Sequence, residues 1–400
     1  MTLDDLINDW NGPPSDAGRV PLLNDETLRD GLQSPSVRDP EIADKRDLTH
    51  RLARLGVDAL NLGCPGAGPK ALAAVRALMV EIRDHRLPLS PNVAVRTLES
   101  DLEQVAEIQQ RAGLSLEAGA FLGSSPVRMD VEGWDLAFLV DTARQAVAFC
   151  HRHQVPVMMV TEDTTRARPE VLKAIYTAAM DEGASSICLS DTCGHATPDG
   201  VRRLVRFIRE EVVGTRPVRI DWHGHNDRGL ALANAIAAFE AGADRLHGTI
   251  LGIGERCGNV ALDQLMINLH LMGFPKGNLT HLPALASRVA ELCGTTIPAN
   301  YPVLGRDAFR TGTGVHAAAI AKALHRGDVE LADAVYSGVP AALVGRRQEI
   351  EIGPMAGHSN VIFWLELNGF DPNPARVERI LRAAKDSPRI LTEAEIRSVL

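Results

Sequence analysis

The chain lacks the features that mark three broad classes of protein. It holds 42 Lys and Arg residues against 51 Asp and Glu residues, and because both signs are mixed along the sequence there is no basic surface of the kind that nucleic-acid binding needs. No apolar stretch reaches the roughly 18–20 residues that cross a bilayer. The N-terminal segment MTLDDLINDW is acidic where a signal peptide would be basic. We therefore expect a cytoplasmic protein that binds neither nucleic acid nor a membrane.

Cysteine is also sparse and scattered. The six cysteines form no C-x-x-C pair and no spacing typical of a disulfide framework, so we expect reduced thiols that lie mostly in the core. At 400 residues with 45% hydrophobic composition, the chain is long enough for one large barrel with an appended region or for two ordinary domains.

Short apolar runs alternate with amphipathic segments between residues 20 and 275, which is the pattern of a parallel sheet built from βα units. Eight such units in succession favour a closed (β/α)8 TIM barrel over an open sheet, which would need a topological switch. From about residue 276 to 400 the pattern changes to short helices, which predicts a mostly helical C-terminal region. The expected strands span residues 20–26, 57–63, 89–96, 114–123, 155–162, 185–191, 218–225 and 244–251.

The strongest local signal is the segment DWHGHND at the end of the seventh expected strand. Residues i and i+2 of a strand point to the same side, so His223 and His225 can present two imidazoles to one metal ion. Two ordinary polar residues at a strand end are the alternative. His151 and His153 repeat the spacing, but on a helical segment, where these positions diverge by about 200°; we expect that pair to be solvated.

Polar residues also follow several other strands. NDETLRDGLQSP, after the first strand, contains Arg29 and Asp30, and a carboxylate there can face the two histidines across the barrel mouth. Glu162 ends the fifth strand and Thr192 follows the sixth. Such positions in a barrel more often serve a site than a core, although some only cap the next helix or form surface ion pairs. The Gly-rich segment GIGERCGN, after the eighth strand, can turn backbone N–H groups toward an anion.

Together, LRDGLQSP, HGHND, GIGERCGN and GTGVHAAAI resemble, in the right order, the metal-dependent TIM-barrel family of 2-isopropylmalate, homocitrate and citramalate synthases and 3-hydroxy-3-methylglutaryl-CoA lyase. The chain is most similar to 2-isopropylmalate synthase-like members without the regulatory domain. The resemblance implies an acyltransferase that condenses acetyl-CoA with a 2-oxo acid and hydrolyses the thioester. It also implies a homodimer.

The same resemblance assigns roles to individual residues. It implies a divalent cation, Mg²⁺, Mn²⁺ or Zn²⁺, on Asp30, His223 and His225, with Asn259 close by. Arg29 would polarise the substrate carbonyl. The remaining implied roles are catalysis by Glu162, by His316 of GVHAAAI and by Tyr336 of VYSGVPAALVG, and contact with the acceptor carboxylate by Thr192.

The sequence departs from the synthases at several positions. Leu32 stands where synthases commonly have glutamate and matches the lyase branch, and Asn61 replaces a glutamate common on the second strand. The distance from His316 to Tyr336 exceeds that of the homocitrate branch, which puts the role of Tyr336 in doubt. A lyase or aldolase that cleaves a 3-hydroxyacyl-CoA or related acid on the same metal site is therefore the alternative. A barrel that has lost catalysis and acts as a binding subunit is a third possibility.

The fifth strand bears on the acceptor. Met158 stands where homocitrate synthases carry an arginine for the distal carboxylate of 2-oxoglutarate. A thioether packs well against a short or branched apolar group, whereas an unpaired carboxylate against it would lose its hydration. We therefore predict pyruvate or a branched 2-oxo acid as the acceptor. Arg96 and Arg128 are the cations that could overturn this prediction, and Arg96 is included among the substrate-binding candidates.

Overall fold

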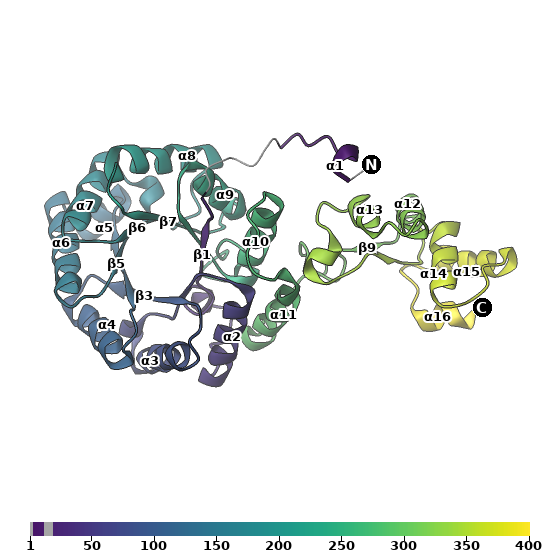
Figure 1. Ribbon diagram of the computed structural model, residues 1–400, viewed down its shortest axis with the longest axis horizontal. Coiled ribbons are helices and arrows are strands. Elements are labelled where there is room, and N and C mark those ends of the chain that lie inside the picture. Colours follow the sequence, from purple (N-terminus) through teal and green to yellow (C-terminus); the bar gives the residue numbers. More distant parts are fainter. Residues whose placement is uncertain (1–2, 12–18) are drawn as a thin grey trace. The chain divides into compact units, whose positions relative to one another are not determined.

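The structure is a computed structural model that describes residues 3–11 and 19–400 (Figure 1). Its internal contacts divide the chain into two compact units. One comprises residues Pro13–Thr296, and the other combines Met1–Gly12 with Ile297–Leu400. The sequence-based boundary between residues 275 and 276 stays a prediction of domain organisation.

The first unit is a closed barrel of eight parallel strands paired in chain order, with β1 also pairing to β8. Each strand falls within a segment expected from the sequence, so the predicted TIM barrel is confirmed (Figure 1). The strands are β1 (Leu22–Asp25), β2 (Ala59–Asn61), β3 (Ser90–Arg96), β4 (Glu117–Gly123), β5 (Val157–Glu162), β6 (Ser186–Asp191), β7 (Arg219–Gly224) and β8 (Arg245–Gly248).

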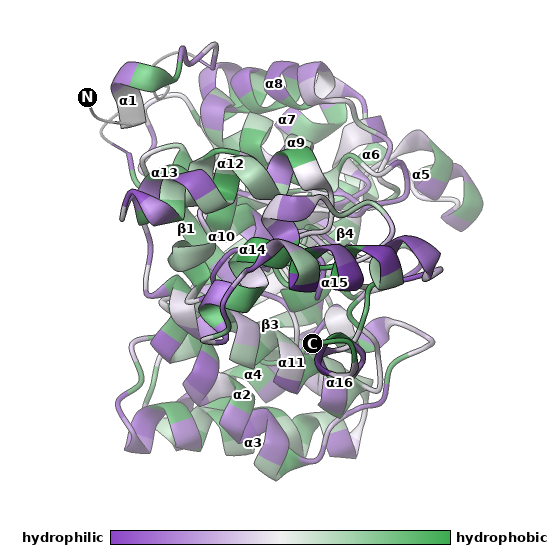
Figure 2. Cartoon of the chain, turned by 90° about the vertical axis from the view of Figure 1, so that its right-hand side faces the viewer, coloured by the Kyte–Doolittle hydropathy of each residue, from purple (hydrophilic) through white to green (hydrophobic). Residues whose placement is uncertain are grey.

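Helices alternate with the strands of the first unit and surround the barrel. They are α2 (Ile42–Leu55), α3 (Pro69–Asp84), α4 (Glu99–Ala112), α5 (Pro126–Glu132), α6 (Leu136–Arg152), α7 (Pro169–Asp181), α8 (Pro198–Phe207), α9 (Ala231–Ala241), α10 (Leu262–Leu271) and α11 (Leu282–Cys293). Hydrophobic and hydrophilic residues alternate along their ribbons, as expected for helices with one buried face (Figure 2).

Helix α2 illustrates how the sequence sets these elements. Leu48, Leu52 and Leu55 recur on one face and are fully or almost fully buried. The helix ends at Gly56, whose φ of 92° is left-handed, and a Cβ there would lie 2.8 Å from the Cα of Gly277. Only glycine fits both the turn and this close approach.

The barrel interior is not purely aliphatic. Near the N-terminal ends of the strands, Arg245 is paired through Nη2 with Glu117 at 2.6 Å, and Arg219 is paired through Nε with Asp221 at 2.8 Å. Asn92, in register with Glu117, donates to Asn24 Oδ1 at 2.7 Å. The charged groups are paired, which offsets the cost of removing them from water.

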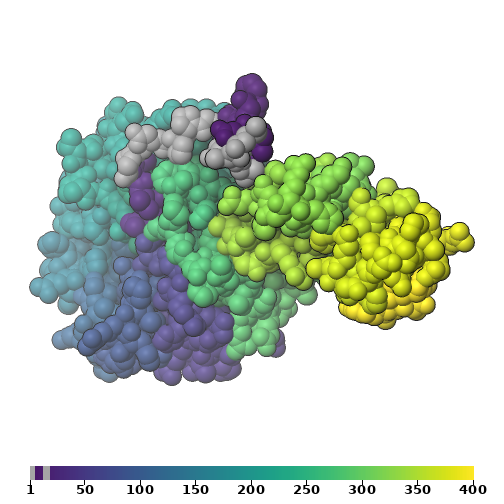
Figure 3. Space-filling view, turned by 45° about the vertical axis from the view of Figure 1, so that its right-hand side comes forward, coloured from purple at the N-terminus to yellow at the C-terminus, as the bar shows by residue number. Residues whose placement is uncertain are grey.

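The second unit is mostly helical, as predicted. It contains α1 (Leu3–Leu6), α12 (Gly314–His325), α13 (Val329–Ala334), α14 (His358–Leu367), α15 (Pro374–Asp386), α16 (Glu393–Ser398) and a short parallel pair, β9 (Arg310–Thr311) and β10 (Glu349–Ile350). Helices α14, α15 and α16 share one apolar cluster, and the end of the chain forms a compact body (Figure 3). Among the described residues, no helix combines the length and apolar composition that crossing a bilayer requires.

Candidate active site

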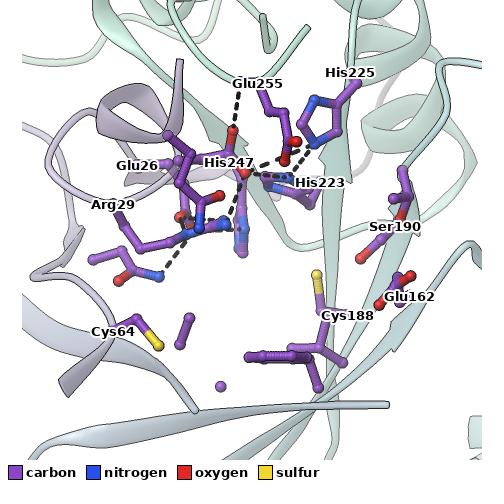
Figure 4. Close-up of a pocket in the computed structure, with 18 of the residues that line it drawn as sticks. Glu26, Arg29, Cys64, Glu162, Cys188, Ser190, His223, His225, His247 and Glu255 are labelled. Carbon is purple, nitrogen blue, oxygen red and sulfur yellow. Dashed lines mark hydrogen bonds and ion pairs between the residues drawn. The ribbon is translucent and has the colours of Figure 1, made fainter. Parts of the chain in front are cut away.

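A cavity of about 450 Å³ opens at the C-terminal ends of the barrel strands. Its lining brings together polar side chains that are far apart in the sequence, including Glu26, Arg29, Glu162 and Thr192. Figure 4 shows Glu26 and Arg29 on one side of this cavity, with Ser190 and Glu162 facing them across it. This is the position at which TIM barrels build their sites.

Three of the predicted metal ligands converge at the rim of this cavity. The Nε2 atoms of His223 and His225 lie 3.3 Å apart, and each lies 3.7 Å from Oδ2 of Asp30. The three side chains are among the groups able to hold one metal ion. Separations of this size fit ligands that share a cation with bonds of about 2.0–2.2 Å.

The protonation of these groups also suits a cation. Burial lowers the pKa of His223 to about 3 and lowers that of His225, so both imidazoles are neutral at pH 7. Burial alone would raise the pKa of Asp30, but the adjacent Arg29 guanidinium and the two histidines hold it well below its usual range. Two neutral imidazoles and a carboxylate are the donor set of many divalent metal sites.

Asn259 completes this cluster. Its Nδ2 donates to Oδ1 of Asp30 at 2.7 Å, while its Oδ1 is buried without a hydrogen-bond partner in the described structure. The loop approaches closely because residue 254 is glycine with φ 155°: a Cβ there would collide with Asn259 Nδ2 and lie 2.9 Å from Asp30 Oδ1. The unpaired amide oxygen therefore leaves one more oxygen donor beside the three ligands.

Arg29 lies between two carboxylates. Its Nη1 donates to Asp30 Oδ2 at 2.7 Å, and its Nε and Nη2 lie 2.7 and 2.6 Å from Oε2 of Glu26. The Arg29 side chain is 16% exposed. The surface ion pair considered from the sequence is therefore wrong, because this pair is largely buried and lines the cavity.

The opposite wall holds further predicted residues. Glu162 is partly exposed, and Thr192 Oγ1 accepts a hydrogen bond from the Asp163 N–H at 2.8 Å. Met158 lines the apolar part of the cavity together with Gly119 and Phe121. The structure thus brings Glu162, Thr192 and Met158 to the cavity that Arg29 and the metal cluster share.

Three predicted residues lie elsewhere. Arg96 is about half exposed, pairs with Asp101 at 2.7 Å and does not line the cavity. His316, on α12, and Tyr336 belong to the second unit, where their rings stack with centroids 3.9 Å apart. Their proposed catalytic roles stay predictions.

Among the cavity residues that were given no role from the sequence are His247 and Glu26, the latter noted only as part of the acidic segment after the first strand. Both line the cavity, and His247 Nδ1 lies 3.2 Å from Glu26 Oε1. A signal was present: Arg245 and His247 occupy alternate positions of a short strand in a barrel, and polar side chains at that spacing point to one side.

The comparisons agree with this geometry. The model of the HMGL-like family matches residues 21–289.

The chain belongs to the HMGL-like family.

Its relatives within this HMGL-like family extend the match to nearly the whole chain. It is 30% identical over 393 residues to a 2-isopropylmalate synthase from Pyrococcus abyssi, covering 96% of this chain and 78% of that one. It is 31% identical over 382 residues to an (R)-citramalate synthase from Methanopyrus kandleri, covering 94% and 71%. The family predicted from the motifs is confirmed.

Solved structures support the fold. A hydroxymethylglutaryl-CoA lyase from Pseudomonas aeruginosa has a TM-score of 0.57 at 22% identity, covering 70% of this chain and 94% of that one. At this identity the likeness shows the fold alone.

Proposed function

We propose that this protein is an acyltransferase that joins the methyl carbon of acetyl-CoA to the ketone carbon of a short or branched 2-oxo acid. The observation that carries the proposal is that the possible metal ligands Asp30, His223 and His225 lie in one cavity beside the largely buried Arg29. The synthase relatives match 94–96% of the chain. This supports condensation over the lyase alternative, because the lyase structure matches only 70% of the chain.

The acceptor needs a pocket in which negative charge can develop on its ketone oxygen. A divalent cation held by Asp30, His223 and His225 supplies, when bound, positive charge beside the acceptor oxygens. Arg29 donates toward the same oxygen with the N–H groups that Glu26 and Asp30 leave free. Thr192 is the proposed contact of the acceptor carboxylate.

The donor must lose a proton from its methyl group. Glu162, and His316 from the second unit, are the proposed bases that take this proton. The carbanion's electron pair then forms the new carbon–carbon bond, and the ketone π pair moves to oxygen, which takes up a proton. Hydrolysis of the thioester by water releases free CoA and the product carboxylate. Tyr336 is proposed to assist His316, on whose ring its own ring stacks.

The acceptor side chain should be apolar. Met158 stands between the cavity and Arg245, whose Nη2 lies 3.3 Å from the Met158 sulfur. That guanidinium is 4% exposed and already pairs with Glu117 and Asp221. Its charge is therefore already compensated by two carboxylates, and neither Arg245 nor Arg96 lines the cavity in which the distal carboxylate of 2-oxoglutarate would lie.

A thiol-release assay tests this proposal. The purified protein is given acetyl-CoA and, in turn, pyruvate, 2-oxoisovalerate and 2-oxoglutarate, with an acceptor-free control for simple hydrolysis. We expect the highest kcat/KM with pyruvate or 2-oxoisovalerate. A preference for 2-oxoglutarate would overturn the Met158 argument. Thiol release with none of these acceptors, together with cleavage of a 3-hydroxyacyl-CoA, would establish the lyase alternative.

A further inference from the structure

A line of alternating charges crosses the barrel interior and ends at Arg29. Each link is a hydrogen bond or ion pair between buried or largely buried side chains, which come from β4, β7, β8 and the segment after β1. In order, the links are Glu117 Oε2 to Arg245 Nη2 at 2.6 Å, Arg245 Nε to Asp221 Oδ2 at 2.5 Å, Asp221 Oδ2 to His247 Nε2 at 2.9 Å, His247 Nδ1 to Glu26 Oε1 at 3.2 Å, and Glu26 Oε2 to Arg29 Nε at 2.7 Å.

His247 is the central link of this line. Its side chain is 2% exposed, and each ring nitrogen faces a carboxylate oxygen. Asp221 and Glu26 each accept from an arginine as well, so both carboxylates act as acceptors. Both His247 nitrogens therefore donate, and the ring lies fixed between two anions of different strands.

Glu26 has no oxygen left for a reaction. Its Oε1 accepts from Asn24 at 2.8 Å, from Asn61 at 3.3 Å and from His247, while Oε2 accepts twice from Arg29. Its side chain is 1% exposed. Glu26 thus sets the plane of the Arg29 guanidinium, and His247 is its only cationic support other than Arg29 among these contacts.

We propose that His247 is a positioning residue for Arg29 and acts through Glu26. The role rests on the proposed function of Arg29 in the condensation. Without the imidazole, the Glu26 carboxylate loses a charged donor and can rotate, which displaces the guanidinium from the reacting oxygen. A displacement of about 1 Å in such a group costs up to about 10²-fold in rate.

The same atoms offer a second interpretation. Glu26, His223 and His247 also lie close enough to hold a metal ion. Both ring nitrogens of His247 are engaged by carboxylates, however, which leaves neither lone pair for a metal. Positioning and metal binding predict different results when His247 is replaced, so metal content is measured in every variant.

The test is a double-mutant cycle on the full chain. His247→Gln keeps much of the side-chain volume but has one donor nitrogen where histidine has two, so it cannot donate to Asp221 and Glu26 from opposite sides. His247→Asn is the second variant if the first does not fold. We expect either variant to lower kcat by about tenfold or more, with both KM values and the metal content unchanged. In the Glu26→Gln background, replacing His247 should lower kcat no further, because its route to Arg29 is already broken.

Arg219→Gln is the matched control. Arg219 also pairs with Glu117 and Asp221, but at the N-terminal end of the line and without touching Glu26. We expect it to lower Tm while kcat stays unchanged. A His247→Gln protein with lower Tm and unchanged kcat would make His247 a structural ion pair only. Additive losses in the double variant, or loss of metal, would also overturn the proposal.

A readout without turnover separates this inference from the proposed function. In ¹⁵N-arginine-labelled protein, the Arg29 Nε–H signal is assigned by its loss in Arg29→Lys. We expect it to shift in His247→Gln and to stay in place in Arg219→Gln. An unmoved signal in His247→Gln would refute positioning, whatever the acceptor assay shows, whereas absence of thiol release from the wild type would refute the proposed function alone.

Discussion

The two units of the chain hold their candidate catalytic residues in contrasting ways. In the barrel, His223 is 7% exposed, and Asp30 and Arg29 share a short ion pair. In the second unit, His316 is exposed and Tyr336 is 49% exposed. The barrel thus presents a fixed charge arrangement, which is what stabilising a developing charge requires. Proton transfer can rely on groups that become aligned only with substrate bound.

The largest effect should follow removal of a metal ligand. His223→Ala leaves two of the three protein ligands, so we expect bound metal and turnover to be lost. His153→Ala is the control, because His153 belongs to the other H-x-H pair and is exposed at the end of α6. Metal analysis and the thiol-release assay are the measurements. Equal activity of the two variants would contradict the proposal that a metal bound at His223 is needed for turnover.

Arg29→Lys should have the next largest effect. An ammonium cannot reproduce the planar donor set that reaches Glu26, Asp30 and the substrate together, and losing such a donor lowers kcat by about 10²-fold or more. Steady-state kinetics measures the loss, and far-ultraviolet circular dichroism checks that the fold is kept. Near wild-type kcat would reduce Arg29 to a structural ion pair.

A smaller effect tests how the second unit contributes. We propose a homodimer in which His316 serves the partner subunit's barrel. In an equal mixture of His316→Ala and His223→Ala proteins, half of the dimers are mixed and each has one intact site, so about one quarter of wild-type activity should return. Native mass spectrometry verifies subunit exchange. No recovery after verified exchange would mean that His316 acts within its own chain or not at all.

The smallest effect is expected for Tyr336→Phe. Its ring stacks on His316 at 3.9 Å, and phenylalanine preserves that stacking while it removes the hydroxyl. One hydrogen bond from an exposed group is worth roughly 0.5–1.5 kcal/mol, so kcat should fall by less than about tenfold. A loss of kcat as large as that of Arg29→Lys would mean that Tyr336 contributes as much to catalysis as the barrel residues do. The contrast between the two units would then be wrong.

Sequence periodicity predicted the strands because each is short, apolar and bounded by a helix with its own period. It also separated the two H-x-H pairs, since His151 and His153 are exposed at the C-terminal end of α6 while the rings of His223 and His225 meet at the end of β7. Pattern therefore sufficed for the fold and for the pairing of His223 with His225, whereas the choice of Asp30 and Asn259 came from the family resemblance.

The sequence did not predict the ion pairs that join His247 to Asp221 and to Glu26 inside the barrel. The contact of His247 with Asp221 joins residues on neighbouring strands, and its contact with Glu26 joins the last strand to the first through barrel closure. Such pairs depend on strand register, which no local spacing records. Arg96 shows the converse: it ends a strand near the cavity, but Asp101 draws its side chain into a separate pair.

The most direct test of the account is a metal titration of protein that has been exhaustively chelated. Thiol release with acetyl-CoA and the preferred acceptor is followed as Mg²⁺, Mn²⁺ or Zn²⁺ is added, and bound metal is counted in parallel. We expect no activity before addition and a rise in activity together with binding, up to one ion per chain. Full activity in protein shown to contain no metal would contradict it.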